Sequence, residues 1–536
     1  MAYFKGLGGW PHANSALPAA VAWHLEDLQY GFVIQRLQQK RSPEEAVLIN
    51  NEIELKLEVD RAGIDMLVAA SIFANAASDS MQTSTYFDTP GQAVRNAGLS
   101  LRIRASGSRR IQTVKFESAS AAGLFARPEW EIPIEGDLPV FDGTGNPIRS
   151  VVPAHELLRL EPIFQIVVNR QIREIAQNGA KIELVLDQGK IVAGYHTLLL
   201  CEIELELKEG SPAAMFELAR ALDAVAPLQL SPMSKAQLGY RLLEGGGDQP
   251  VTSTPMSLRG EMALSEGFAV IAQACVRQFR LNQSILTRTG SPEALHQARV
   301  ALRRLRSAMS IFKDMLADAR FEYFLVSLRW IARELDKARN LDVLLRRLPN
   351  AAHSVTLRLA REHAYATVMD ALVSARLRML MIDFVEWIVI GNWRTGCVAT
   401  IVDQRIDSFA SKALDRCHRR VKRRGRHWGK LDDETRHRLR IQVKKLRYAS
   451  EFFCALFPAT KALDRQKEFF KALRALQTSL GALNDQATGA ALLAELGLSE
   501  VIIGTMAKEQ AQNRSSMMED ASQAYDTLVN AKRFWR

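Results

Sequence analysis

Cysteine is scarce in this chain of 536 residues, and its five cysteines are scattered: Cys201, Cys275, Cys397, Cys417 and Cys454. No two of them have the CxxC spacing of a zinc ribbon, and the total is odd. Disulfide frameworks and zinc ribbons need closely spaced pairs, so both are disfavoured. The cysteines therefore favour a reducing compartment.

Long hydrophobic runs are also missing. The most apolar stretch, RMLMIDFVEWIVIGNW (378–393), is interrupted by Asp383 and Glu386 and is too short to cross a bilayer. The first residues, MAYFKGLGGWPHANS, lack the basic start and apolar run of a secretion signal. The P-loop motif GxxxxGK[ST] is absent as well. We expect a soluble, cytoplasmic protein with no membrane partner and no P-loop nucleotide site.

Charge is divided unevenly along the chain. Residues 51–245 carry 19 Lys and Arg against 25 Asp and Glu, whereas residues 246–536 carry 47 against 30. A chain of this length exceeds a single core, so two or more domains are expected. An acidic module joined to a basic one suggests that both address a polyanion, the first through metal ions and the second directly. Nucleic acid, an anionic membrane and polyphosphate all fit this division.

Hydrophobic periodicity separates the chain into two structural classes. Up to residue 243 the pattern has a period of two, with helices predicted only at 62–76 and 212–224, and beyond the linker-like EGGGDQPVTSTP (244–255) it becomes helical. We predict an α+β protein with an extension of unknown role (1–49), an eight-stranded antiparallel barrel domain (50–245), a linker (246–258) and an all-α domain (259–536). The eight predicted strands are EIELKLEV (52–59), STYFDT (84–89), LSLRIRAS (99–106), IQTVKFES (111–118), RPEWEIPIE (127–135), FQIVVNRQIREIA (164–176), KIELVLDQGKIV (181–192) and LLLCEIELELKEG (198–210).

An internal repeat organises the helical half. HQARVALRRLRSAMSIF (296–312) aligns without a gap with HRLRIQVKKLRYASEFF (437–453), at an offset of 141 residues. Downstream, LDKARNLDV (335–343) pairs with LGALNDQAT (480–488) at a nearly equal offset. The duplication predicts two related helical bundles, about 259–400 and 401–536.

Charged side chains share one face of each predicted strand. Glu52, Glu54 and Lys56 alternate with Ile53, Leu55 and Leu57, and the other strands repeat this separation. A solvated surface would explain one such strand. A closed barrel with a charged lumen also explains why acidic and basic residues segregate by strand. Clustered carboxylates can hold a hard divalent metal, and Arg and Lys facing them can grip phosphate oxygens.

The barrel half resembles CYTH domains, the triphosphate tunnel metalloenzymes. The resemblance rests on nine fragments in order across about 190 residues: EIELK, which has the family's ExExK form, YFDT, LRIR, TVK, RPEWE, NR, ELVLDQG, EIELEL and SKAQLGY. It implies a tunnel that binds a triphosphate end-on with Mg²⁺ or Mn²⁺, and hydrolysis by water rather than by a covalent nucleophile. Catalytic roles fall on Glu52, Glu54 and Lys56. The implied metal ligands are Glu52, Glu54, Asp187 and two of Glu202, Glu204 and Glu206, which share one parity, and the implied phosphate-binding cations are Lys56, Arg102, Arg104, Lys115, Arg170 and Lys235.

A basic stripe marks each copy of the helical repeat. His296, Arg299, Arg303 and Arg306 lie on one face over three turns, and His437, Arg440, Lys444 and Arg447 repeat the pattern. Such a stripe in one copy is usually a solvated face, but like charges at these spacings destabilise a helix, so a bound polyanion explains the repetition. The pattern resembles the CHAD domain, a duplicated helical module associated with inorganic polyphosphate. Arg304 and Lys445 would extend the stripe, and RCHRRVKRRGRHWGK (416–430) is predicted to be a mobile basic loop.

Together these features predict a metal-dependent inorganic triphosphatase that converts tripolyphosphate to pyrophosphate and phosphate, with the helical domain binding polyphosphate. Association with polyphosphate granules is one expected location, and nucleic acid is a less favoured partner. Two alternatives remain open: a class IV adenylyl cyclase or an organic triphosphatase acting on thiamine triphosphate, and a non-catalytic polyphosphate-binding adaptor. The sequence leaves open the preferred metal, the polyphosphate chain length and the oligomeric state.

Overall fold

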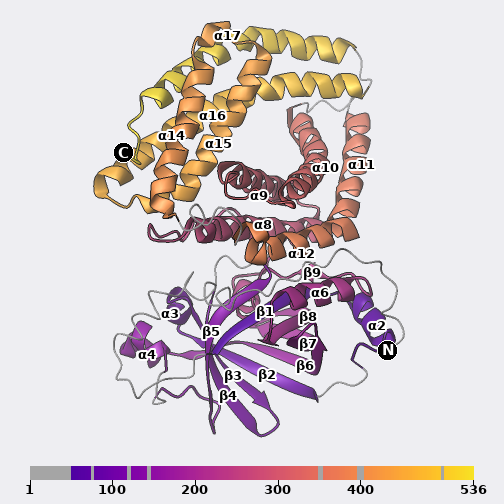
Figure 1. Ribbon diagram of the computed structural model, residues 1–536. Coiled ribbons are helices and arrows are strands. Elements are labelled where there is room, and N and C mark those ends of the chain that lie inside the picture. The colour runs from indigo at the N-terminus through magenta and orange to yellow at the C-terminus, as the bar shows by residue number, and fades with distance from the viewer. Residues whose placement is uncertain are drawn as a thin grey trace.

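The computed structural model describes residues 50–73, 78–117, 122–141, 146–347, 354–394, 404–496 and 500–536. The predicted extension 1–49 and Cys397 lie outside these residues. Two parts follow each other along the chain, a strand-rich part and a helical part, and Figure 1 shows the helical part stacked on one end of the strand-rich part.

Eight strands of the first part close into an antiparallel barrel. The strand order is β5-β4-β3-β2-β6-β7-β8-β1, and β1 closes the ring because it pairs with both β8 and β5. On the edge of β1 that pairs with β5, a two-residue strand, β9, pairs with Leu57 and Glu58. The predicted eight-stranded tunnel barrel is therefore confirmed. The strands are β1 (Asn50–Glu58), β2 (Ser78–Asp88), β3 (Leu99–Ser106), β4 (Arg109–Phe116), β5 (Leu124–Pro133), β6 (Glu161–Gln177), β7 (Ala180–Ala193), β8 (His196–Glu209) and β9 (Gln229–Leu230).

Alternation along the strands sends apolar side chains outward and charged side chains inward. Leu55 and Leu57 on β1 are fully buried in the same core as Leu67 of α2 and Leu222 of α6. A second core covers the outside of β3, β4 and β5 beneath α3 and α4. The barrel wall is thus held from outside, which leaves the charged face for the lumen. The helices of this part are α2 (Arg61–Ala69), α3 (Ala93–Asn96), α4 (Ile148–Val151), α5 (Ala154–Leu157), α6 (Ala213–Asp223) and α7 (Lys235–Leu243).

Helix α7 closes one end of the barrel from within. Its Ala236 and Tyr240 share a core with Phe164 and Val168 of β6. These two β6 residues lie on the same face of the strand as Arg170, which lines the lumen. The aromatic rings stack closely, with 4.6 Å between the centroids of Tyr86 and Phe164. The lumen therefore ends at α7, whose first residue is the predicted phosphate ligand Lys235.

Gly239 permits the close approach of α7 to β6. A Cβ atom at this position would lie 2.5 Å from Cδ2 of Phe164, whose ring cannot retreat because other aromatic rings surround it. We expect Gly239→Ala to lower the free energy of unfolding by about 1–3 kcal/mol, as overpacking does. Thermal melts of the purified chain measure this loss. Gly481→Ala is the matched control, because that helical glycine faces open space and alanine there should stabilise by about 0.5–1 kcal/mol.

The second part is helical throughout the described residues, as predicted. The aligned repeats lie in α9 and α15, which pack against each other, and the downstream repeats lie in α10 and α16. Figure 1 shows α8 and α12 beside the barrel and the remaining helices farther from it. The helices are α8 (Leu264–Thr289), α9 (Pro292–Ile311), α10 (Phe321–Arg347), α11 (Ser354–Val373), α12 (Ala375–Ile390), α14 (Ile406–Gly425), α15 (Asp433–Phe453), α16 (Thr460–Glu495) and α17 (Glu500–Asn530), with short 3-10 turns at Asn392–Arg394, Trp428–Lys430 and Cys454–Leu456.

Two predictions about local structure were wrong. The segment 416–430 is not a loop: its first ten residues complete α14, and Gly425 ends that helix buried against the ring of Tyr525. Glycine is common in mobile loops, but here it allows close packing of α14 against Tyr525. The helix predicted at 62–76 is also shorter than expected, since α2 ends at Ala69.

The two parts share one continuous hydrophobic core. Helix α12 packs against α6 and β9, and Met256 and Leu258 of the predicted linker are buried in the same cluster. Ion pairs surround this contact, including Arg378 with Asp223 at 2.6 Å. Within the described part of the chain, no helix has the length and hydropathy that a membrane crossing requires.

Candidate active site

The barrel lumen is a cavity of about 810 Å³, within the usual size range of ligand sites. Inward-facing residues of all the long strands and of α7 line it. Ten of the site residues predicted from the sequence are among them: Glu52, Glu54, Lys56, Arg102, Arg104, Lys115, Arg170, Glu204, Glu206 and Lys235. The remaining two, Asp187 and Glu202, are fully buried in the wall behind the cavity.

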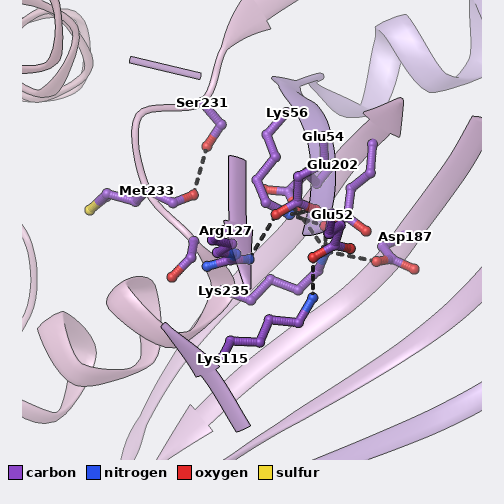
Figure 2. A network of polar contacts seen from close by, with 12 residues as sticks. Glu52, Glu54, Lys56, Lys115, Arg127, Asp187, Glu202, Ser231, Met233 and Lys235 are labelled. Atoms are coloured by element: carbon purple, nitrogen blue, oxygen red, sulfur yellow. Dashed lines mark hydrogen bonds and ion pairs between the residues drawn. The ribbon is translucent and has the colours of Figure 1, made fainter. Parts of the chain in front are cut away.

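Two lysines and three carboxylates lie together where α7 closes the tunnel, and Figure 2 labels Lys56, Asp187, Glu202 and Lys235 among them. Lys235 Nζ lies 2.8 Å from Asp187 Oδ2, 2.7 Å from Glu202 Oε1 and 2.6 Å from Glu204 Oε1. Lys56 Nζ contacts Glu204 and lies 3.4 Å from Glu202 Oε1. We call these five residues the closed-end cluster. It alternates in sign, so each buried charge has an opposite neighbour.

Burial and neighbouring charges oppose each other in this cluster. Burial disfavours the charged lysines, but the surrounding carboxylates outweigh it and raise the pKa of both Lys56 and Lys235. Burial also raises the pKa of Glu202. For Glu204 burial acts in the same direction, yet Lys235 and Lys56 hold its pKa well below the ordinary value. The two lysines therefore stay charged and can serve as permanent cations toward an anionic ligand.

Further cations lie along the tunnel between its closed end and its mouth. Arg170 forms a charge-assisted pair with Asp187, with Nε 2.8 Å from Oδ1. Lys115 Nζ lies 2.6 Å from Glu52 Oε2 and 2.9 Å from Glu129 Oε2. Because these groups alternate in sign as well, an entering polyanion would meet cations already held in place by carboxylates.

Arg127, the first residue of the RPEWE fragment, belongs to the same network. Its guanidinium is buried and lies 2.7 Å from Glu54 Oε1 and 3.3 Å from Glu117 Oε1. Glu117 also accepts a hydrogen bond of 2.8 Å from Ser234, the residue before Lys235. Sequence reasoning missed Glu117 and Ser234. Glu117 continues the alternation of Thr113 and Lys115 along β4, and that parity could have identified it.

The mouth of the tunnel has more carboxylates than cations on its β1–β8 side. Glu54 and Glu206 are direct cross-strand partners, and so are Glu183 and Glu206. Burial, together with Glu52 and Glu183, raises the pKa of Glu206 to about 7 against the opposing effect of Lys208. Negative charge is thus incompletely compensated at this point of the lumen.

The opposite wall of the mouth is basic. Arg104 Nη2 lies 3.2 Å from Glu131 Oε1, and Arg102 Nη2 lies 3.9 Å from Glu129 Oε1. Arg102 is the largest cause of the lowered pKa of Arg104, which means that two guanidinium groups crowd together. Phosphate oxygens placed between them would relieve this repulsion.

Carboxylate oxygens are suitable ligands for a divalent metal, but the described residues do not position them as a metal site. In the described residues, no group of three or more His, Cys, Asp or Glu side chains is arranged to hold a metal ion, and Lys56 and Lys115 lie among the carboxylates. The uncompensated charge around Glu206 is what a hard cation with oxygen ligands would neutralise. The donor set at the mouth therefore fits Mg²⁺ or Mn²⁺ better than a soft metal.

Position in the tunnel distinguishes the three glutamates that the sequence could not separate. Glu204 and Glu206 line the cavity, whereas Glu202 is 1% exposed and accepts hydrogen bonds from Lys56 and Lys235. The parity is the same for all three, but only two reach the space that a ligand would fill.

The helical half brings each basic stripe onto a partly exposed face. Side chains of the first stripe are all half-buried on α9, and Arg299 Nε donates 2.5 Å to Asp336 of α10. On α15, His437 Nδ1 lies 2.6 Å from Asn484 Oδ1, and Arg447 Nη1 donates 2.8 Å to Gln477. Both stripes therefore face the next helix of their own repeat.

Positive charge on α10 adds to the first stripe and was missed from the sequence. Burial, followed by Arg329 and Arg333, lowers the pKa of Arg306, and burial, followed by Arg339, lowers the pKa of His296 to about 4. Their spacing places them on the α10 face that meets α9. We call the two stripes with these α10 arginines the basic surface.

Arg304 is buried beneath that surface, and Lys445 lies half-buried beside it. Arg304 is 2% exposed, donates 3.0 Å to Gln278 and lies over the ring of Phe452. Lys445 Nζ donates 2.6 Å to Ser310 Oγ across the contact between α15 and α9. Both residues join helices together, because a position beside the stripe on a packed helix also meets the neighbouring helix.

Comparison with known proteins gives a family for each part. The CYTH domain model matches residues 50–240, and the CHAD domain model matches residues 270–494. The inorganic triphosphatase of Haemophilus influenzae is 33% identical over 196 residues, which cover 36% of this chain and 54% of that protein. The match thus spans about half the length of that curated relative.

Solved structures similar to each part are known. The CHAD domain of the plant Ricinus communis is 26% identical with a TM-score of 0.42 and covers 53% of this chain and 98% of that chain. HpAC1 from Hippeastrum, described as having a dominant triphosphatase activity, is 18% identical with a TM-score of 0.28 and covers 36% of this chain and 96% of that chain. From the family models, the barrel of this protein is a CYTH domain and its helical half is a CHAD domain, joined in tandem.

Proposed function

We propose that this protein is a metal-dependent inorganic triphosphatase that hydrolyses tripolyphosphate to pyrophosphate and phosphate in its tunnel. The observation that carries the proposal is the closed-end cluster, in which Lys56 and Lys235 remain charged at the bottom of a deep lumen. A linear triphosphate matches this space, because it is narrow, highly charged and needs cations along its length. The Haemophilus influenzae relative bears the name inorganic triphosphatase, which supports the inorganic substrate over the alternatives.

The tunnel residues have separate roles in this proposal. Lys56, Lys235 and Arg170 bind oxygens of the inner phosphates, while Arg102, Arg104 and Lys115 bind the phosphates nearer the mouth. Fixed cations of this kind stabilise the charge that develops when a phosphoryl group leaves. No covalent attack on the substrate by a side chain is needed.

Carboxylates between the closed end and the mouth complete the site. Glu52, Glu54, Glu204 and Glu206 would hold Mg²⁺ or Mn²⁺, and Asp187 and Glu202 would fix the lysines beside them. The metal would supply charge neutralisation and a more acidic water. Glu52 and Glu206, at the exposed end, can accept the proton of a water that attacks the outer phosphorus in line.

Phosphate release by the full chain tests the proposal directly. Tripolyphosphate, ATP, thiamine triphosphate and long-chain polyphosphate are offered with Mg²⁺ or with Mn²⁺, and cyclic AMP is assayed in parallel. We expect kcat/KM to be highest for tripolyphosphate. Cyclic AMP formation would instead assign the tunnel to cyclase chemistry, and no turnover of any substrate would favour the polyphosphate-binding adaptor.

Removal of divalent metal tests the proposed cofactor. We expect excess EDTA to reduce tripolyphosphate turnover to background, because the tunnel carboxylates repel the anionic substrate unless a divalent cation lies between them. Added Mg²⁺ or Mn²⁺ should restore turnover, and Ca²⁺ serves as a control for a larger hard cation. Full activity after exhaustive chelation would contradict metal dependence.

For the CHAD domain we propose binding of longer polyphosphate on the basic surface. The support is the clustering of cations there: burial and then the neighbouring arginines lower the pKa of Arg306 and of His296. A flexible polyanion following the two stripes would remove this repulsion. Cytoplasmic location and association with polyphosphate granules belong to the same proposal.

A further inference from the structure

Helix α8 of the CHAD domain reaches the closed end of the tunnel. Two of its arginines, Arg277 and Arg280, are one turn apart and contact the chain on either side of Lys235. Other interdomain contacts, such as those of Arg378 and Arg220, lead to α6 on the outside of the barrel. The two α8 arginines are therefore distinct in touching the segment that closes the lumen.

Arg280 holds the strand that precedes α7. Its side chain is 2% exposed, its Nε donates 3.0 Å to the carbonyl oxygen of Leu230, and its Nη2 lies 3.6 Å from Glu58 Oε2. Leu230 pairs with Leu57 in β9, and the next residue, Ser231, donates its N–H to the carbonyl oxygen of Lys56 at 2.8 Å. Arg280 thus fixes the backbone next to both lysines of the closed-end cluster.

Arg277 holds the first turn of α7 itself. Its Nη2 donates 2.9 Å to Oε1 of Gln237, and Gln237 forms the capping box of α7 with Ser234. Lys235 lies between these two capping residues, so the capping geometry sets the direction in which its side chain leaves the helix. Arg277 of α8 therefore contacts Gln237, a capping residue that sets the direction of the Lys235 side chain into the lumen.

Stability alone does not account for these arginines. Nη2 of Arg280 is buried and donates no hydrogen bond within the described residues, and burial lowers the pKa of both guanidinium groups. A buried charge with incomplete pairing contributes little to stability and costs desolvation. The apolar contact of α12 with α6 and β9 already joins the domains. What the arginines add is a fixed geometry for β9 and α7.

We propose that Arg277 and Arg280 are positioning residues through which the CHAD domain holds Lys235 in its place in the tunnel. In this arrangement the helical domain is part of the structure that makes the tunnel competent, in addition to any ligand that it binds. The proposal rests on the proposed function only for its kinetic readout, because displacement of Lys235 also changes the binding of tripolyphosphate.

The test uses the full chain with Arg277→Met, Arg280→Met and Arg280→Lys. A shift of about 1 Å in a group that orients substrate can cost about 100-fold in rate, so we expect kcat/KM for tripolyphosphate to fall at least about 10-fold in each methionine variant. Arg280→Lys retains a donor for Leu230 and should recover part of the loss. Arg220→Met is the matched control: it removes interdomain ion pairs of 3.1 Å with Asp383 and Glu386, forms no hydrogen bond or ion pair with β9 or α7 within the described residues, and should retain wild-type kinetics.

A double-mutant cycle with Lys235→Ala separates positioning from general damage. If the arginines act through Lys235, Arg277→Met should cause no further loss in the Lys235→Ala background. Full additivity, or wild-type kinetics in both methionine variants, would overturn the proposal. Should Arg280→Met fail to fold, the half-buried Arg277 carries the same cycle.

Calorimetric titration with tripolyphosphate distinguishes this proposal from the proposed function. If the wild-type chain binds tripolyphosphate without hydrolysing it, the proposed triphosphatase activity is refuted. The double-mutant cycle with Lys235→Ala is then measured with Kd values in place of kcat/KM. Equal Kd values for the wild-type chain and for Arg277→Met and Arg280→Met would then overturn the positioning role.

Discussion

Glu54→Gln should reduce metal-dependent tripolyphosphate turnover by at least about 100-fold, the upper end of what loss of a metal-site partner costs. Glu54 is 2% exposed and lies 3.1 Å from Lys56 Nζ and 2.7 Å from Arg127 Nη2. Glutamine keeps the shape of the side chain but removes the charge that would face both the metal and these cations. The measurement is steady-state phosphate release with saturating Mg²⁺ or Mn²⁺.

Two controls accompany this substitution. Glu209→Gln removes a carboxylate from the exposed end of β8, where it pairs with Lys181 at 2.6 Å, and should leave turnover unchanged. Polyphosphate binding by residues 255–536 should also be unchanged in Glu54→Gln, since that surface lies in the other domain. Retained turnover in a folded Glu54→Gln protein would refute the proposed site.

Reversing charge at Arg303, Arg306, Lys444 and Arg447 should weaken binding of long-chain polyphosphate by roughly 100-fold at low salt. Binding releases fewer counterions for each phosphate contact that is lost. The slope of log affinity against log salt concentration should therefore become shallower by about 3. Fluorescence anisotropy with labelled polyphosphate at several salt concentrations measures both changes. Tripolyphosphate turnover should stay at the wild-type value.

The control for this variant keeps the change in net charge and moves it elsewhere. Lys181, Lys190, Lys461 and Lys467 are exposed lysines outside the basic surface, and reversing all four removes the same charge. Equal weakening by both variants would mean that net charge, and not the basic surface, governs binding. Unchanged affinity in the stripe variant would move the site to another basic region, such as the end of α14.

Most of the barrel could be predicted from local sequence patterns. Alternation along β1 and β8 depends only on the two-residue period of a strand, so it revealed the charged lumen of Glu52, Glu54 and Glu204 without any structure. The duplicated stripe of α9 and α15 was visible for the same reason, since helical spacing and a fixed offset are properties of the chain. Each of these features is encoded by residues near one another in sequence.

The depth of each side chain in the structure and the identity of its partners depended on contacts between distant segments. Glu202, Glu204 and Glu206 have the same parity, yet α7 enters the lumen and makes Glu202 a buried partner of Lys235. Arg304 has the same residue type as Arg303 one position before it, yet the packing of α9 on α15 buries it against Phe452. Neither outcome has a local signal, because it depends on which element covers which face.

The sequence by itself determined the strand and helix classes, the charged face of each strand and the duplication of the helical half, because these follow from periodicity and spacing. Only the tertiary structure decided that the barrel closes through β1 and β5, that α7 ends the lumen, and that Arg277 and Arg280 of the other domain contact Gln237 and Leu230, on either side of Lys235. Those features require residues far apart in the chain to meet, and burial and pairing arise only when they do.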